Sequence, residues 1–202
     1  MYRVLCIVKV FFACAEVSST LSQYRLNSLG AGEYCIPMDL SVILNSIREA
    51  ILESPVSLGP TAEIKNNFQT SLQNKFNNNI RHVETCETEY CLAQVLDGSY
   101  DGYNDKCDVF VETRDYIVIV ELDATRADQV AKKMLSRYFY AEKSSKPTVY
   151  VCLLYPGTTY MNPNECVKYM NMGKDVLLRM NSHNRFIGGF VDGETIDWKL
   201  IG

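Results

Sequence analysis

Several patterns that identify common enzyme classes are missing from this chain. It contains neither a G-x-x-x-x-G-K-[ST] loop nor a G-x-G-x-x-G loop, so ATPase and dinucleotide-binding functions have no support. Its only histidines, His82 and His183, lie in no recognised hydrolase pattern with serine or cysteine. No N-x-S/T sequon and no internal repeat is present, so the sequence does not support secretion or a solenoid.

The eight cysteines form no C-x-x-C pair. A zinc set can be assembled from His82, Cys86, Cys91 and Cys107, but its spacings match no common zinc pattern. Cys152 lies inside the apolar run TVYVCLLY and is expected to be buried. Reduced structural thiols explain this distribution best, and they predict a cytoplasmic protein.

No long uncharged apolar run occurs near the start of the chain, because Lys9 interrupts residues 1–15. That stretch is too short to cross a bilayer as a helix, so no membrane association is expected. The favoured interpretation is that residues 1–15 stay in the protein and form a strand. A signal peptide ending near Ala13 and Ala15 is the alternative, which would leave six cysteines and make disulfides plausible.

The chain has 202 residues, of which 47% are hydrophobic, and this suffices for one domain with a substantial core. We expect a single domain over 1–202, with an N-terminal extension over 1–60, a core over 61–154, and a C-terminal helix and hairpin over 155–202. The net charge of −4 argues against a protein that coats nucleic acid non-specifically. A local basic groove is still compatible with this net charge.

Apolar periodicity predicts a mixed α/β fold, with a central sheet flanked by helices on both faces. The order is helix, three strands, helix, strand, helix and hairpin. Expected helices cover 40–52, 61–76, 126–140 and 163–180. Expected strands cover 80–84, 107–113, 116–122, 148–154, 185–191 and 195–200, the last two joined by a turn at Asp192-Gly193. The stretch over 90–96 is a possible further strand. Gly188-Gly189 is expected to mark a β-bulge.

Three acidic residues stand at the ends of two neighbouring strands. Asp108 opens the strand over 107–113, while Glu121 and Asp123 close the strand over 116–122. A hairpin brings these ends together, and carboxylates held that closely repel each other unless a cation lies among them. Oxygen ligands of this kind suit Mg²⁺ or Mn²⁺.

A structural explanation of the same acids is a salt-bridged cluster, in which Arg114, Arg126 and Lys132 are the candidate counter-ions. On the helix over 126–140, Val130, Met134 and Tyr138 form a core stripe in either interpretation. Lys132, Lys133 and Arg137 are expected to lie on the solvated face of that helix rather than to hold a phosphate.

The order of elements and the residues Asp108 and Glu121-Leu122-Asp123 together resemble the core of the PD-(D/E)XK nuclease superfamily over about half of the chain, 61–154. The resemblance implies that Asp108, Glu121 and the backbone carbonyl of Leu122 hold Mg²⁺ or Mn²⁺, with Glu63 on the preceding helix as a further metal ligand. The family's motif lysine is replaced by Asp123, and its motif proline by Cys107.

Some restriction enzymes of this family carry an acid or an amide at the lysine position, as Asp123 would be here; the alternative is that the lysine function has moved to Lys132 or Lys133. The resemblance also implies that Gln129 lies near the site. Asp108, Glu121, Asp123 and Lys132 are therefore the expected catalytic residues. The expected function is a restriction-like DNA endonuclease that cuts double-stranded DNA as a homodimer. Candidates for base contacts are 77–79, Arg81, 97–106, Asn181, Asn184 and Arg185. The alternative is a catalytically decayed module that binds nucleic acid or a protein partner.

Overall fold

The fold is taken from a computed structural model, which describes residues 39–57, 59–92, 105–156, 162–179 and 183–201. The chain divides into two units, 1–37 and 38–202, and every described residue belongs to the second. The strand expected near the N-terminus therefore lies outside the described residues. None of the helices in the described ranges combines the length and apolar character needed to cross a membrane.

A six-stranded mixed sheet forms the centre of this unit, with its strands arranged in the order of the sequence. The strands β1, β2 and β3 form an antiparallel meander, β4 and β5 continue it in parallel, and β6 returns antiparallel. Their bounds are Val83–Cys91, Lys106–Thr113, Ile117–Ala124, Thr148–Tyr155, Arg185–Asp192 and Thr195–Ile201.

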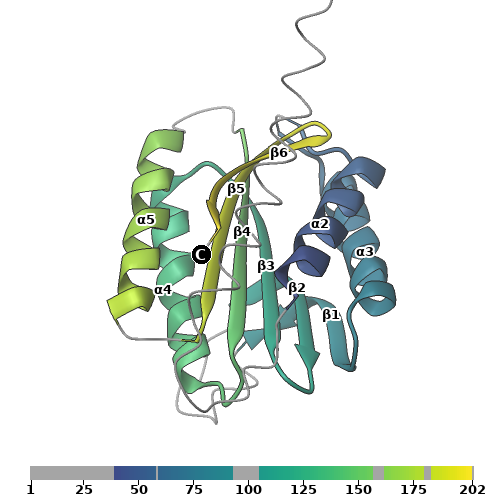
Figure 1. The fold of residues 1–202 in the computed structure, drawn as a ribbon. Coiled ribbons are helices and arrows are strands. Elements are labelled where there is room, and N and C mark those ends of the chain that lie inside the picture. The colour runs from purple at the N-terminus through teal and green to yellow at the C-terminus, as the bar shows by residue number, and fades with distance from the viewer. Residues whose placement is uncertain (1–38, 58, 93–104, 157–161, 180–182, 202) are drawn as a thin grey trace, which may run out of the picture. The chain divides into compact units, whose positions relative to one another are not determined.

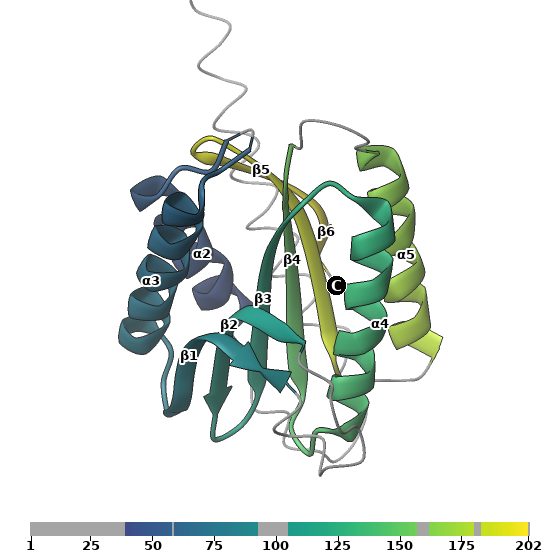
Figure 2. The same cartoon turned by 180° about the vertical axis from the view of Figure 1, so that it is seen from behind.

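Four helices cover the two faces of the sheet. The helices α2 (Leu40–Glu53) and α3 (Ala62–Asn79) lie on one face, and α4 (Ala127–Lys143) and α5 (Pro163–Arg179) lie on the other (Figure 1). The view from behind places the same two pairs on opposite sides (Figure 2). The predicted α/β fold, a mixed sheet with helices on both faces, is confirmed.

Local sequence explains where α2 and α3 begin. The Asp39 carboxylate accepts from the Ser41 amide, and the Thr61 hydroxyl accepts from the Ile64 amide, so each helix starts behind a side-chain cap. Phe68, Leu72 and Phe76 recur every four residues along α3 and form a buried apolar stripe. This stripe fixes which side of α3 faces the sheet.

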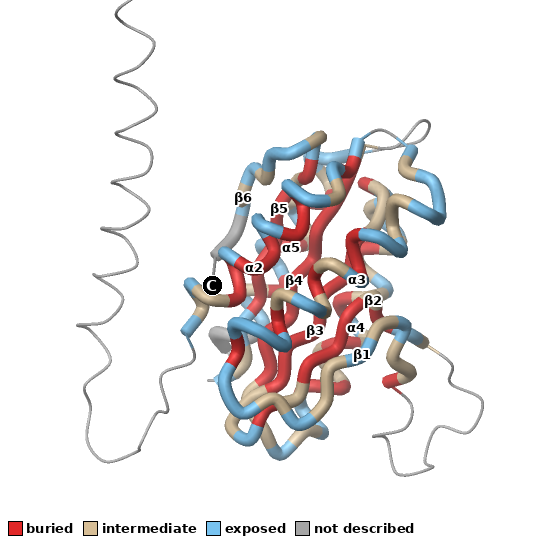
Figure 3. The backbone as a smooth tube through the Cα atoms, turned by 90° about the vertical axis from the view of Figure 1, so that its right-hand side faces the viewer, coloured by how far each residue is buried: buried red, intermediate tan, exposed pale blue. Residues whose placement is uncertain are grey.

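Two apolar cores lie against the sheet. Val109, Val118 and Val120 belong to the core under α2 and α3, while Phe110 and Ile119 belong to the core under α4 and α5. Every residue of β4 is buried, as expected for a central strand covered on both faces (Figure 3). Alternation along β2 and β3 thus assigns each side chain to one helical layer.

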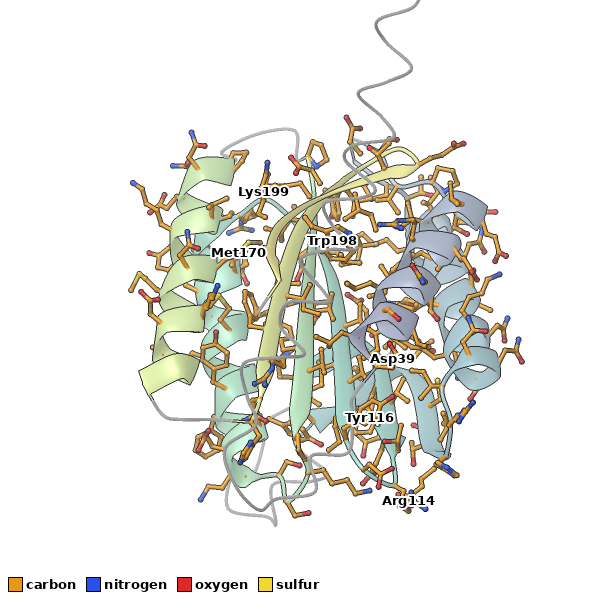
Figure 4. All side chains as sticks on the ribbon, in the orientation of Figure 1. Asp39, Arg114, Tyr116, Met170, Trp198 and Lys199 are labelled. Carbon is orange, nitrogen blue, oxygen red and sulfur yellow. The ribbon has the colours of Figure 1, made fainter. Side chains whose placement is uncertain are left out.

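Two details of the sheet bear on the sequence predictions. The strand β1 joins the end of the stretch expected over 80–84 to the start of the one expected over 90–96, of which 93–96 lie outside the described residues. Its residues are largely polar because it is an edge strand, where apolar alternation is not required. The bulge expected at Gly188-Gly189 is confirmed by a register shift between β5 and β6 at those residues. There, Met170 of α5 packs against Gly188, where a side chain would collide with it (Figure 4).

Candidate functional site

The candidate site lies at the open end of the β2–β3 hairpin, away from its turn. Strand pairing is continuous from Glu112–Ile117 at the turn to Val109–Val120. Asp108 and Glu121 are the next residues beyond this last pair, and Asp123 follows two residues later. The hairpin therefore brings the three acids to one end of the sheet, as the sequence predicts.

Glu121 is a buried carboxylate with two cationic partners from α4. Only 1% of its surface is exposed. The Arg137 guanidinium donates to Oε1 through Nε at 2.8 Å and also through Nη2. The Lys133 ammonium donates to Oε2 at 2.8 Å. Each oxygen of the carboxylate thus has its own cation.

Lys133 also forms an ion pair with Asp123, so its ammonium lies between two carboxylates. The Lys133 and Asp123 side chains retain 23% and 29% of their exposure, in contrast to the enclosed Glu121. Solvent therefore reaches the site from the Asp123 side. A positive charge at this position satisfies both acids at once.

Arg137 is fully buried and connects three parts of the fold. Besides Glu121, it donates to the Lys106 carbonyl at 3.0 Å and forms an ion pair with Asp105, both at the start of β2. The prediction that Arg137 lies on the solvated helix face is therefore wrong. Its spacing from Val130 and Met134 places it on the same buried stripe of α4, and a buried arginine is tolerated there because carboxylates pair with it.

Asp108 is held by neutral donors. Its Oδ1 accepts from Gln69 Nε2 of α3 at 2.7 Å, and its Oδ2 accepts from the Leu122 amide at 2.6 Å. Gln69 Nε2 also donates to Glu89 at 2.8 Å, and Glu89 has the uncommon positive φ of 52°. Asp108 is thus fixed by α3, whereas Glu121 is fixed by α4.

Burial governs the charge state of these acids. Desolvation raises the pKa of Asp108, against the lowering effect of the Leu122 amide. Desolvation also raises the pKa of Glu121 to about 7, although Arg137 and Lys133 oppose this rise. For Lys133, desolvation is outweighed by Glu121 and Asp123, so its pKa is raised and the ammonium stays charged at neutral pH.

Several residues expected at the site lie elsewhere. Glu63 and Lys132 are exposed, and the residues that contact the acids from α3 and α4 are Gln69 and Lys133. Among the expected counter-ions, Arg114 pairs with Asp115 and Arg126 pairs with Asp128. Of the candidates for base contacts, Asn181 and 97–104 lie outside the described residues.

The arrangement of acidic side chains bears on whether the site could hold a metal ion. Within the described part of the chain, no three His, Cys, Asp or Glu residues are grouped closely enough to hold a metal ion, and this includes the zinc set built on His82. The Lys133 ammonium already contacts the Glu121 and Asp123 carboxylates, at the position where a metal ion would contact the same oxygens. These donors are carboxylate oxygens, which Mg²⁺ and Mn²⁺ prefer, but both oxygens of Asp108 and of Glu121 already accept from protein groups, so the arrangement as it stands does not fit a bound ion.

No family model matches the chain, and no curated protein matches it.

Proposed function

We propose that this protein is a metal-dependent endonuclease that hydrolyses phosphodiester bonds in double-stranded DNA. The observation that carries the proposal is the Lys133 ammonium held between Glu121 and Asp123, with Asp108 on the adjacent strand end. A cation already occupies the centre of an acidic group to which solvent has access. The order helix, three strands, helix, strand supports the same function through its resemblance to the PD-(D/E)XK core.

The acids as they stand are not grouped closely enough to hold a metal ion, so Mg²⁺ or Mn²⁺ would be held by Asp108, Glu121 and the Leu122 carbonyl only after it displaces the Lys133 ammonium. When bound, such an ion polarises a phosphoryl oxygen and lowers the pKa of water. Asp108 and Glu121 suit the role of ligands because α3 and α4 hold their carboxylates in place. Preorganised ligands of this kind avoid the cost of ordering flexible side chains.

Lys133 and Asp123 would act on the reacting groups. Because its pKa is raised, Lys133 keeps its charge, so it would stabilise the negative charge that develops on the phosphate rather than serve as a base. Asp123 is the acid nearest to solvent, and its carboxylate would accept the proton of the attacking water. Attack at phosphorus would break the bond to the 3′-oxygen, which leaves with a proton from solvent.

A homodimer is part of this proposal, since two-fold symmetry of the protein matches that of a palindromic DNA site. A decayed nuclease fold that only binds nucleic acid or protein is the second candidate. The observation that favours it is the pairing of both Glu121 oxygens with cations. In that case Lys133 and Arg137 would replace the metal permanently.

The test is cleavage of plasmid DNA by purified protein with Mg²⁺ or Mn²⁺. We expect the wild type to cut, and Asp108→Asn and Lys133→Met each to reduce the rate by at least about 100-fold, because both remove charge stabilisation. Glu112→Gln and Lys146→Met are matched controls, since this pair forms a similar bridge at the opposite end of the hairpin. Absence of cleavage together with absence of Mn²⁺ binding would establish the decayed alternative.

A further inference from the structure

The described sheet ends in two edge strands, β1 on one side and β6 on the other. Among the described strands β6 pairs with β5 alone, so its outer edge carries backbone N–H and C=O groups that none of these strands satisfies. Such an edge can accept a further strand from another chain. Which chain fits depends on the side chains that the edge presents.

The two edge strands differ in charge. β1 has the sequence VETCETEYC, with three glutamates and neither lysine nor arginine. Two copies of β1 side by side would therefore bring only like charges together, which is unfavourable. β6 has the sequence TIDWKLI, in which Asp197 and Lys199 lie on either side of Trp198. Of these two edges, β6 is the one whose charges are compatible with a second copy of itself.

The two charged side chains of β6 share one face of the sheet. Asp197 pairs across the strands with Phe190, which packs against the core under α4 and α5, so Asp197 lies on that face. Lys199 forms an ion pair with Asp197 and therefore projects from the same face. Trp198 lies on the other face, over Gly189, where an added Cβ would come within 2.9 Å of the indole Cε3. Asp197 and Lys199 keep 65% and 38% of their side-chain exposure, so both are accessible to a partner.

We propose that β6 is a dimer interface, at which β6 of a second copy of this chain pairs antiparallel about a two-fold axis at Trp198. Residues equally far from Trp198 then face each other, so Asp197 lies opposite Lys199 of the second copy, and symmetry repeats this contact. The two sheets join into one continuous sheet. The inference goes beyond the proposed function, which includes a homodimer but places no interface, and it does not depend on DNA cleavage.

Charge also selects the register of this pairing. An axis at Asp197 would set two aspartates opposite each other, and an axis at Lys199 would set two lysines opposite each other, both of which are unfavourable. A shift that places the axis between residues would oppose side chains from different faces of the sheet. A lone lysine on an edge strand commonly prevents pairing, but here Asp197 of the other copy complements it.

The experiment is sedimentation velocity of the full-length protein at low ionic strength, where screening of the charges is weakest. We expect the wild type to be a dimer. Lys199→Asp makes acid face acid at both contacts, and Asp197→Lys makes lysine face lysine, so each should raise the dissociation constant of the dimer at least about tenfold. Lys168→Asp is the matched control, because it makes the same charge reversal at an exposed position of α5, and it should leave the dimer intact.

A mixture of the two single variants separates a direct contact from a general effect of charge. One variant carries acids on both sides of Trp198 and the other carries lysines, so opposite charges face each other at both contacts and the mixture should dimerise again. A wild type that stays monomeric at about 100 μM would overturn the inference, and DNA cleavage by that monomer would still support the nuclease. A dimer that survives both single variants, or a mixture that stays monomeric, would also overturn it.

Discussion

Two lysines of this protein each bridge a pair of carboxylates, at opposite ends of the same hairpin. Lys133 joins Glu121 to Asp123 at the open end. Lys146 joins Glu84 to Glu112 near the turn where Arg114 lies (Figure 4), with distances of 2.8 Å to each. The two lysine side chains are equally exposed, at 23%.

Their acidic partners differ. Glu84 and Glu112 keep 52% and 34% of their exposure, so water can replace the lysine at little cost. Glu121 is enclosed, has a second cation in Arg137, and lies beside the acid of the next strand, Asp108. The comparison shows that a lysine between two acids is not a functional feature by itself. The open end differs from the turn because Glu121 is buried and because a third acid, Asp108, lies beside it.

The largest expected difference concerns Arg137. Replacing it by Met at pH 8 leaves the buried Glu121 carboxylate without its main partner, and the free energy of unfolding should fall by about 3–5 kcal/mol. Arg114→Met removes an exposed pair near the turn and should cost less than about 1 kcal/mol. Urea unfolding of both variants measures the two values. Equal losses would mean that the two ends do not differ as described.

A second difference should appear in the dependence of stability on pH. The folded pKa of Glu121, about 7, lies above its ordinary value of 4.5, so the folded state holds this proton more tightly. The resulting stabilisation is complete below about pH 4.5 and is lost as the pH rises through 7, with a total near 3 kcal/mol. Denaturant unfolding from pH 4.5 to 8 should show this decline in the wild type and a smaller one in Glu121→Gln, where Asp108, whose pKa is also raised, still contributes. A parallel decline in that variant would exclude Glu121 as its source.

The lysines themselves provide the third test. Lys133→Met removes a charged partner from the buried Glu121 and should destabilise the protein by about 1.5–3 kcal/mol. Lys146→Met affects exposed acids and should cost under about 1 kcal/mol. Thermal unfolding at neutral pH compares the pair. If Lys146 proved the more important for stability, burial of the acid would not be the deciding factor.

The smallest effect on the free energy of unfolding is expected for Gln69, the hydrogen-bond donor on α3. Gln69→Leu leaves Asp108 with one fewer hydrogen bond and should cost about 1–2 kcal/mol. Gln73→Leu, one turn later, removes a bond to the Cys86 carbonyl and should cost about 1 kcal/mol. Because these values are close, the sharper readout is the carboxyl carbon resonance of Asp108, which should titrate at a different pH only in the Gln69 variant.

Most of the fold could be predicted from the sequence, since the strands around the site and the helix after them have clear apolar periodicity. The convergence of Asp108, Glu121 and Asp123 followed from the hairpin. The partners of these acids were harder to find. Arg137 falls on the same stripe as Val130 and Met134, but its charge suggested a solvated face. Gln69 follows the buried Phe68, and no local pattern relates it to a strand 39 residues away.

The central claim is that a divalent cation binds at the open end of the hairpin and not at the turn. It can be tested by adding substoichiometric Mn²⁺ to ¹⁵N-labelled protein and following the amide resonances. The Leu122 amide, which donates to Asp108, should broaden first. The Thr113 amide lies five residues along β2, roughly 17 Å from Asp108, and should stay sharp. Equal broadening at both amides, or none at Leu122 with saturating Mn²⁺, would contradict the account.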